Sequence, residues 1–185
     1  MNVALRKRMT IEEFPAWEDR QQERWESDGS QPVALVRGTR ARPIVNGDSI
    51  TALNPRLRGG PCRAIIEGVK IKPAGRVRYP DLFVECGPSD NQGTIADNPV
   101  VVFEGQSPST SSVGMIEKNA EYRAAPSNQC YVMLAQDRIA ATVFERRGEE
   151  WVGTLFTDAQ AVLHMPEIGL SLPLLECSEG VIEPG

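Results

Sequence analysis

The chain has 185 residues, of which 41% are hydrophobic and 24% are charged, a composition typical of one globular domain spanning residues 1–185. No apolar run approaches the roughly 20 residues of a membrane-spanning helix, and the basic start of the chain lacks the apolar core of a secretory signal. We therefore expect a cytoplasmic protein with no membrane partner, in which residues 1–8 form a flexible basic arm.

The net charge of −5 conceals a strong asymmetry along the chain. Residues 33–80 contain ten Lys and Arg but two Asp and Glu, a net charge of +8, whereas residues 81–185 carry −11. A basic block inside an acidic chain suits contact with a polyanion such as nucleic acid on one side only. The alternative is a solvated basic face, paired with the acidic half of a partner subunit.

The cysteines and the single histidine argue against a zinc site. Cys62, Cys86, Cys130 and Cys177 are far apart and form no C-x-x-C pair, which predicts reduced and mostly buried thiols. His164 has no second histidine to share a metal with, so we expect it to be structural.

The first elements follow from capping and hydrophobic spacing. Thr10 and Glu13 have the spacing of a capping box, with Met9 and Phe14 placed for a hydrophobic staple. This pattern predicts a helix over residues 11–22, which Pro15 kinks or shortens. The next expected elements are a strand at 32–37, a helix at 42–57, a strand pair or one bent strand at 62–72, and a strand at 81–85.

The central stretch of the chain is an apolar, β-branched run at residues 100–103, which predicts a strand buried on both faces. The run ends in Glu104, and residues 107–110 (SPST) can form a turn that caps a helix at 113–124. Later strands are expected at 130–135, 139–145 and 151–156, with a further edge strand at 169–175. This order of elements indicates an α/β or α+β sandwich with a mixed sheet.

Two carboxylates are predicted to meet at one end of this sheet. Asp81 opens one strand and Glu104 closes the next, so antiparallel pairing would place them side by side. Gly105 has no side chain, which leaves its carbonyl accessible as a further oxygen ligand. Such hard oxygen ligands suit Mg²⁺ or Mn²⁺. Alternatively, Asp81 caps a turn and Glu104 pairs with an arginine.

A divalent ion there would make a hydroxide nucleophile available near neutral pH and would neutralise charge on a phosphate undergoing attack. Lys118 is the best candidate for an additional positive charge, and Tyr122 lies one helical turn away from it. The two residues form either a functional face of their helix or a solvent-exposed one. The apolar stripe of the same helix comprises Val113, Ile116, Ala120 and Ala124.

Four segments, in their order and spacing, resemble the Uma family, which belongs to the PD-(D/E)XK superfamily of restriction-type endonucleases. The resemblance covers about residues 9–155. The segments are Trp25-Glu26-x-Asp28-Gly29, Tyr79-Pro80-Asp81-Leu82-Phe83-Val84, Val101–Thr110 and Lys118-x-x-x-Tyr122.

The resemblance implies a restriction-endonuclease-like fold, with a mixed sheet flanked by helices and an αβββαβ core with extra strands. It implies a Mg²⁺- or Mn²⁺-dependent endonuclease that hydrolyses DNA and acts as a homodimer. The metal ligands would be Glu26, Asp81, Glu104 and the Gly105 carbonyl. The catalytic residues would be Asp81, Glu104, Gln106 (at the position of the motif's lysine) and Lys118, with Tyr122 in support. From the basic segment, Arg40, Arg42, Arg76 and Arg78 are expected to bind DNA phosphates.

The chain also departs from the family pattern. Arg42 stands where the family often has a histidine, and Gly114 and Met115 replace a usual Asp-Arg pair. These departures support an alternative, a catalytically weakened or inactive module of the nuclease fold that binds DNA or protein. A glycoside hydrolase with two acidic residues is set aside, because three tryptophans and three tyrosines leave little aromatic surface for stacking on sugars.

Overall fold

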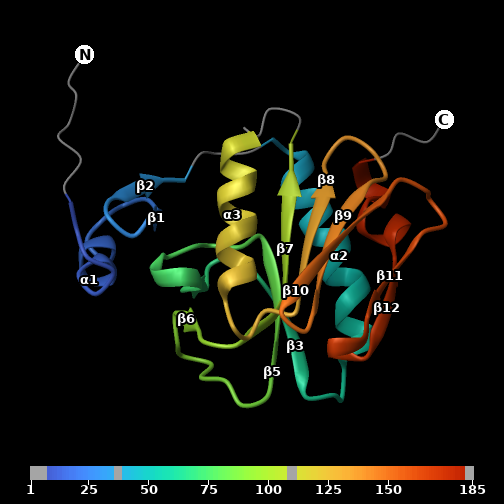
Figure 1. Ribbon diagram of the computed structural model, residues 1–185, viewed down its shortest axis with the longest axis horizontal. Coiled ribbons are helices and arrows are strands. Elements are labelled where there is room, and N and C mark those ends of the chain that lie inside the picture. Colours follow the sequence, from blue (N-terminus) through green and yellow to red (C-terminus); the bar gives the residue numbers. More distant parts are fainter. Residues whose placement is uncertain (1–7, 36–38, 108–111, 182–185) are drawn as a thin grey trace.

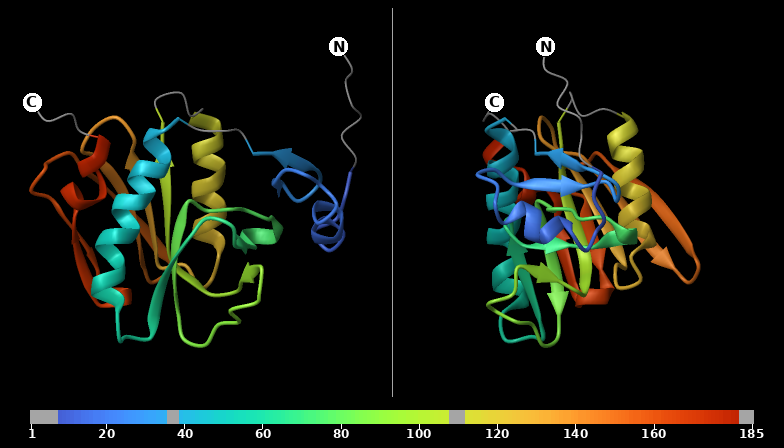
Figure 2. Two further views of the ribbon diagram at one scale, coloured as in Figure 1. Left: turned by 180° about the vertical axis from the view of Figure 1, so that it is seen from behind. Right: turned by 90° about the vertical axis from the view of Figure 1, so that its left-hand side faces the viewer.

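The computed structural model describes residues 8–35, 39–107 and 112–181, and its centre is a six-stranded mixed sheet (Figure 1). The strand order is β10-β9-β8-β7-β5-β3, and all neighbours are antiparallel except β7 and β8. Helices α2 and α3 lie on opposite faces of the sheet (Figure 2, right). The expected mixed sheet flanked by helices is thereby confirmed. Its elements are α2 (Ala41–Leu57), β3 (Cys62–Ile66), β5 (Leu82–Cys86), β7 (Pro99–Gln106), α3 (Ser112–Ala124), β8 (Cys130–Ala135), β9 (Ala141–Arg147) and β10 (Glu150–Phe156).

Smaller elements surround this sandwich. An N-terminal unit, the blue segment at the left of Figure 1, contains α1 (Phe14–Glu18), β1 (Trp25–Ser27) and β2 (Pro32–Ala34). Two short pairs are β4 (Lys70–Ile71) with β6 (Ile95–Ala96), and β11 (Val162–Met165) with β12 (Leu170–Pro173). Short 3-10 helices are η1 (Pro73–Gly75), η2 (Pro166–Ile168), η3 (Leu174–Cys177) and η4 (Glu179–Val181).

β7 is buried on both faces, as its apolar run predicts. Val101 and Phe103 belong to the large core that the sheet forms with α2, whereas Val102 belongs to a second core that includes Tyr122 of α3. The strand continues beyond residue 103 because it keeps pairing with β8, up to Gln106 opposite Ala135. The site residues that follow Phe103 are therefore held in a sheet and not in a loop.

The N-terminal capping box is formed as predicted. The Thr10 amide donates to Glu13 Oε2 (3.0 Å) and the Glu13 amide donates to Thr10 Oγ1 (3.3 Å). The helix is shorter than the expected 11–22, because the chain turns back after Glu18. The Glu18 side chain then accepts a hydrogen bond from the Trp25 amide (3.1 Å).

Two expectations about strand pairing are corrected. The segment 62–72 is neither a strand pair nor one bent strand: β3 pairs with β5, whereas β4 pairs with β6, because a turn with positive φ at Glu67 and Gly68 separates them. The strand expected at 169–175 exists as β12, but it pairs with β11 and not with the edge of the main sheet. No helix in the described ranges combines the length and hydropathy that a membrane span requires.

The prediction of reduced thiols is wrong for one pair of cysteines. Cys62 and Cys86 stand directly opposite each other on β3 and β5 and form a disulfide. Their separation of 24 residues gave no sign of contact, because only the register of the two strands brings them together. Cys130 and Cys177 are free and buried, as expected. His164 is exposed on β11, where its Nδ1 lies 2.9 Å from Ser171 Oγ.

Candidate active site

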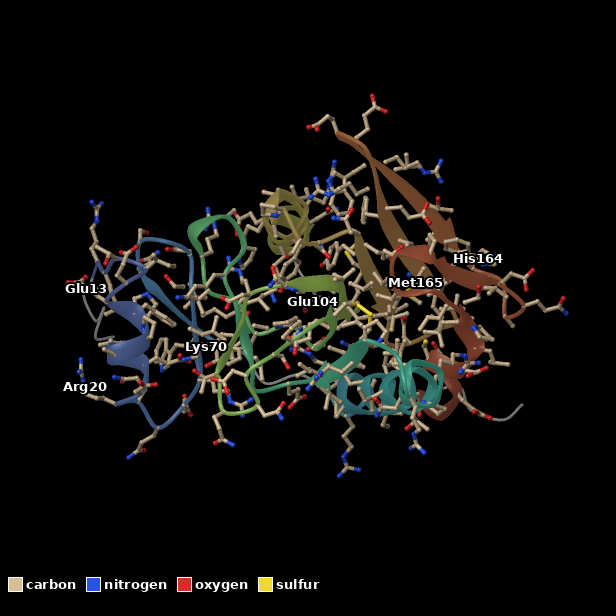
Figure 3. All side chains as sticks on the ribbon, turned by 90° about the horizontal axis from the view of Figure 1, so that it is seen from below. Glu13, Arg20, Lys70, Glu104, His164 and Met165 are labelled. Carbon is tan, nitrogen blue, oxygen red and sulfur yellow. A yellow bond between two sulfur atoms is a disulfide. The ribbon has the colours of Figure 1, made fainter. Side chains whose placement is uncertain are left out.

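The antiparallel pairing of β5 with β7 brings Asp81 and Glu104 together at one end of the sheet. Leu82 is the partner of Phe103, so the residues just outside this pair, Asp81 and Glu104, lie side by side. Both carboxylates are more than nine-tenths buried. Figure 3 shows Glu104 between the two helices that flank the sheet. The predicted meeting of the two carboxylates is therefore present.

Asp81 is fixed from two directions. Its Oδ2 accepts the backbone N–H of Gly105 (2.7 Å), and its Oδ1 accepts Arg42 Nε (2.6 Å) and forms an ion pair with Arg42 Nη2. Burial and the charge of Glu104 raise the pKa of Asp81 to about 6, although the bonds from Arg42 and Gly105 act in the opposite direction. The charged form of Asp81 is therefore stabilised by a cation beside it, and Arg42 supplies that positive charge here.

Glu104 is held mainly by α3. Its Oε1 accepts hydrogen bonds from Tyr122 Oη (2.7 Å) and Lys118 Nζ (3.2 Å), whereas its Oε2 lies 3.8 Å from Arg42 Nη2. Burial raises the pKa of the Tyr122 phenol well above its usual value, and nearby Glu104 raises it further, so Tyr122 remains a hydrogen-bond donor. Burial opposes the charge on Lys118, but Glu104 and Glu26 raise its pKa overall. Lys118 is therefore a cation of the site.

Glu26 reaches this site from β1 of the N-terminal unit. Its Oε1 accepts the Tyr79 amide (3.2 Å) and lies 3.5 Å from Lys118 Nζ, so Lys118 links Glu26 to Glu104. Its Oε2 lies 3.4 Å from Arg78 Nη1. In the described ranges, no three His, Cys, Asp or Glu side chains gather closely enough to form a ready-made metal centre.

The orientation of α3 corrects the expected apolar stripe. Ile116 is 69% exposed, and Ala120 and Ala124 are exposed as well. The face turned inward carries Glu121 and Tyr122, both buried, together with the partly buried Lys118. Of the two alternatives for Lys118 and Tyr122, the structure selects a face that lines the site.

Gly105 lies where three side chains converge. A Cβ at this position would come within 2.9 Å of Gln136 Nε2, 3.2 Å of Asp81 Oδ2 and 3.6 Å of Arg42 Cγ. Gln136 was missed in the sequence, although it follows β8, whose end lies beside that of β7 because the two strands are parallel. Gln106 is partly buried at the end of β7, and its carbonyl accepts the Gln136 amide (3.1 Å).

About half of the described cations of the basic segment form ion pairs inside the chain, so this segment is not a uniformly free basic face. Arg78 is buried and its guanidinium donates to both oxygens of Glu121 (2.6 and 2.8 Å). Arg76 also reaches Glu121 (3.1 Å), with about a third of its side chain exposed, whereas Arg40 is exposed before α2. Buried Lys70 pairs with Glu18 (2.7 Å). Arg37 and residues 108–110 of the predicted SPST turn lie outside the described residues.

A cavity of about 360 Å³ opens beside Asp81. Its lining includes Asp81 and Arg42 on the side of the site, with Arg24, Glu67 and Tyr79 further along. Arg24 lies over the ring of Tyr79, 5.7 Å from its centroid. The cavity therefore adjoins one carboxylate of the pair, and its wall carries positive and negative side chains and one aromatic ring.

Comparisons with known proteins identify a family and a shared fold. The model of the Uma2 family, described as "Putative restriction endonuclease", matches residues 11–175. An uncharacterized protein of Synechocystis sp. is 27% identical over 168 residues, which cover 89% of this chain and 88% of that protein. A crystal structure from Anabaena variabilis, described as a "putative nuclease belonging to DUF820", superposes with a TM-score of 0.75 at 14% identity, covering 94% of this chain and 99% of that one. At that identity, the superposition shows a shared fold.

Proposed function

The chain belongs to the Uma2 family, and we propose that it is a divalent-metal-dependent endonuclease that hydrolyses phosphodiester bonds in DNA. The observation that carries the proposal is the pair of buried carboxylates, Asp81 and Glu104, on adjacent strands beside Lys118. Two carboxylates and a lysine at one sheet end are the groups that metal-assisted phosphodiester hydrolysis needs.

The donor set fits Mg²⁺ or Mn²⁺. Asp81 and Glu104 offer hard oxygen atoms, and the guanidinium of Arg42 already contacts both carboxylates, so the position between them favours a cation. Mg²⁺ is commonly bound through one or two carboxylates, with waters and substrate phosphates as its other ligands. Glu26 and the Gly105 carbonyl are the proposed additional ligands. A bound ion would lower the pKa of a water molecule and neutralise charge on the phosphate.

The residues around the pair would position it and bind the substrate. Tyr122 and Lys118 hold Glu104, and the Gly105 amide holds Asp81, so both carboxylates have a defined orientation before DNA binds. The Lys118 ammonium would stabilise negative charge on the phosphate, and Gln106 would orient the attacking water.

Exposed arginines would contact the DNA backbone. Arg40 is accessible before α2, and Arg76 is partly accessible beside the site. Their contacts would be with phosphates and would carry no sequence information. Two copies of the chain, each with one site, would be needed to cut both DNA strands, so we propose a homodimer as the active form.

A second function is favoured by one observation, the ion pair between Arg42 and Asp81. A module that binds DNA or protein without cleavage would need no metal, and Arg42 would simply neutralise the carboxylates. Metal binding separates the two functions, since the binding module has no use for it.

The test is calorimetric titration of Mn²⁺ and Mg²⁺ into the purified protein, followed by incubation of supercoiled plasmid with the same samples. We expect saturable metal binding and metal-dependent nicking, both lost in Asp81→Asn and Glu104→Gln. Glu85→Gln is the matched control, because Glu85 is a buried carboxylate on the same strand as Leu82 but at its far end. Wild type that neither binds metal nor nicks DNA would exclude the endonuclease and leave the binding module.

A further inference from the structure

We propose that Arg42 sets the divalent-cation affinity of the Asp81–Glu104 pair, because its guanidinium occupies the position between the two carboxylates and must leave when a metal ion binds. The inference rests on the proposed metal-dependent function and adds a residue that controls metal loading. In the sequence, Arg42 is distinguished only because it stands where the family often has a histidine.

The hydrogen bonds of the pair leave little room for a second cation. Asp81 Oδ1 accepts a hydrogen bond from Arg42 Nε and forms an ion pair with Arg42 Nη2, and Asp81 Oδ2 accepts the Gly105 amide. Glu104 Oε1 is engaged by Tyr122 and Lys118. The remaining oxygen, Glu104 Oε2, faces Arg42 Nη2 at 3.8 Å. A metal ion that bridges the two carboxylates would therefore meet the guanidinium first.

Charge leads to the same conclusion. The connected ion pairs of the site already balance: four carboxylates (Asp81, Glu104, Glu26 and Glu121) face four cations (Arg42, Lys118, Arg78 and Arg76). A divalent ion added to this set would create an excess of positive charge inside a mostly buried site, where repulsion is strong. Departure of Arg42 lowers this excess by one charge.

The adjoining cavity offers space for that movement. The Arg42 side chain is 26% exposed and lines this cavity of about 360 Å³, whose lining does not include Glu104. Glu67 lines the same cavity and is the proposed partner of the displaced guanidinium. Arg42 comes from the first turn of α2, so a change of side-chain rotamer moves the guanidinium without moving the helix.

The experiment measures Mn²⁺ affinity by calorimetry for wild type, Arg42→Gln, Arg24→Gln and the double variant Arg42→Gln/Asp81→Asn. Arg24 is the matched control, since it lines the same cavity and carries the same charge but, among the residues that the structure describes, forms no ion pair with either carboxylate. We expect Arg42→Gln to bind Mn²⁺ about tenfold more tightly than wild type, with a clearly smaller change in Arg24→Gln. The double variant should not show this increase in Mn²⁺ affinity.

The outcomes separate this inference from the proposed function. Metal binding by wild type that Arg42→Gln strengthens no more than Arg24→Gln would overturn the role of Arg42 and leave the metal site intact. Absence of Mn²⁺ binding in wild type and in Arg42→Gln alike would overturn the metal site, and the role of Arg42 with it.

A measurement on the wild-type chain covers the case in which Arg42→Gln does not fold. In protein labelled with ¹⁵N-arginine, the Nε–H signal of Arg42 should shift when Mg²⁺ is added, because its bond to Asp81 breaks. Arg56, which pairs with Glu176 through 2.8 Å bonds at another place in the fold, should keep its signal. A carboxyl signal of Asp81 that responds to Mg²⁺ while the Arg42 signal stays constant would contradict the displacement.

Discussion

Gly105 shows how tightly the site is assembled at the level of single atoms. Its amide binds Asp81, and its missing side chain lets Gln136 and Arg42 approach the same point. An added methyl group would have to displace side chains that are themselves held by ion pairs and hydrogen bonds. The glycine is thus required by close approach, not by an unusual backbone angle.

Gly105→Ala is therefore expected to lower the free energy of unfolding by about 1–3 kcal/mol, as measured by urea denaturation. Gly47→Ala is the control: it lies inside α2, where a Cβ would meet nothing within 4 Å. That substitution should stabilise the protein by up to about 1 kcal/mol, because alanine favours helix. Equal stability of Gly105→Ala and wild type would show that the neighbouring side chains can move aside for a Cβ at this position.

At the level of elements, α3 is turned so that its polar residues face the sheet. The stripe of Ile116, Ala120 and Ala124 has helical spacing, and such spacing usually marks a buried face. Here Tyr122 packs in the second core, and both Tyr122 and Lys118 contact Glu104, so these contacts hold the orientation. Periodicity alone could not show this, because it contains no information about Glu104.

Paired substitutions test the orientation of α3 by urea denaturation. Ile116→Lys should change the free energy of unfolding by no more than about 0.5 kcal/mol, because the side chain is exposed. Tyr122→Phe should cost about 1–3 kcal/mol, since it removes a buried hydrogen bond and leaves Glu104 with one donor fewer on Oε1. A larger loss for Ile116→Lys than for Tyr122→Phe would contradict the arrangement.

The disulfide between β3 and β5 closes a loop with a sequence separation of 24 residues. Removing it in the double variant Cys62→Ala/Cys86→Ala should cost about 3 kcal/mol, since the unfolded chain gains freedom. Reductant should destabilise wild type by a similar amount and leave the double variant unchanged in the same unfolding assay. If reductant leaves wild-type stability unaltered, the bond contributes nothing to it.

The sequence anticipated the elements that depend on local pattern and short connections. Both long helices begin within one residue of the prediction, and the meeting of Asp81 with Glu104 follows from one hairpin-like pairing. The contacts that were missed depend on register or on distant segments: Cys62 with Cys86, Gln136 beside Gly105, and Arg42 on Asp81. None of these has a signal in the local sequence. The metal and DNA roles of the site residues stay predictions.

At the scale of the whole molecule, the distribution of charged groups differs most from what the sequence predicts. The basic segment is not one free surface, because Arg78, Lys70 and Arg42 are paired with carboxylates from other segments. A limited number of exposed arginines therefore remains for DNA. Binding should weaken with salt, but with a modest slope.

This expectation can be measured through the salt dependence of DNA binding. Arg40→Gln should reduce the slope of log K against log salt by about 0.9, the value for one lost phosphate contact. Arg58→Gln is the control, since Arg58 is also exposed but follows the opposite end of α2, about 25 Å away along the helix. Equal slopes for the two variants would argue against DNA contact near Arg40.

The covalent bond between β3 and β5 also affects how the sheet can come apart. β3 is an edge strand, and edge strands are the first to detach and to pair with other chains. With Cys62 joined to Cys86, the hydrogen bonds of β3 can open from the Ile66 end, but the strand cannot separate from β5. Fraying on this side therefore stays local, and exchange of β3 with another molecule requires that the disulfide be reduced first, a restraint that the opposite edge strand, β10, lacks because it contains no cysteine.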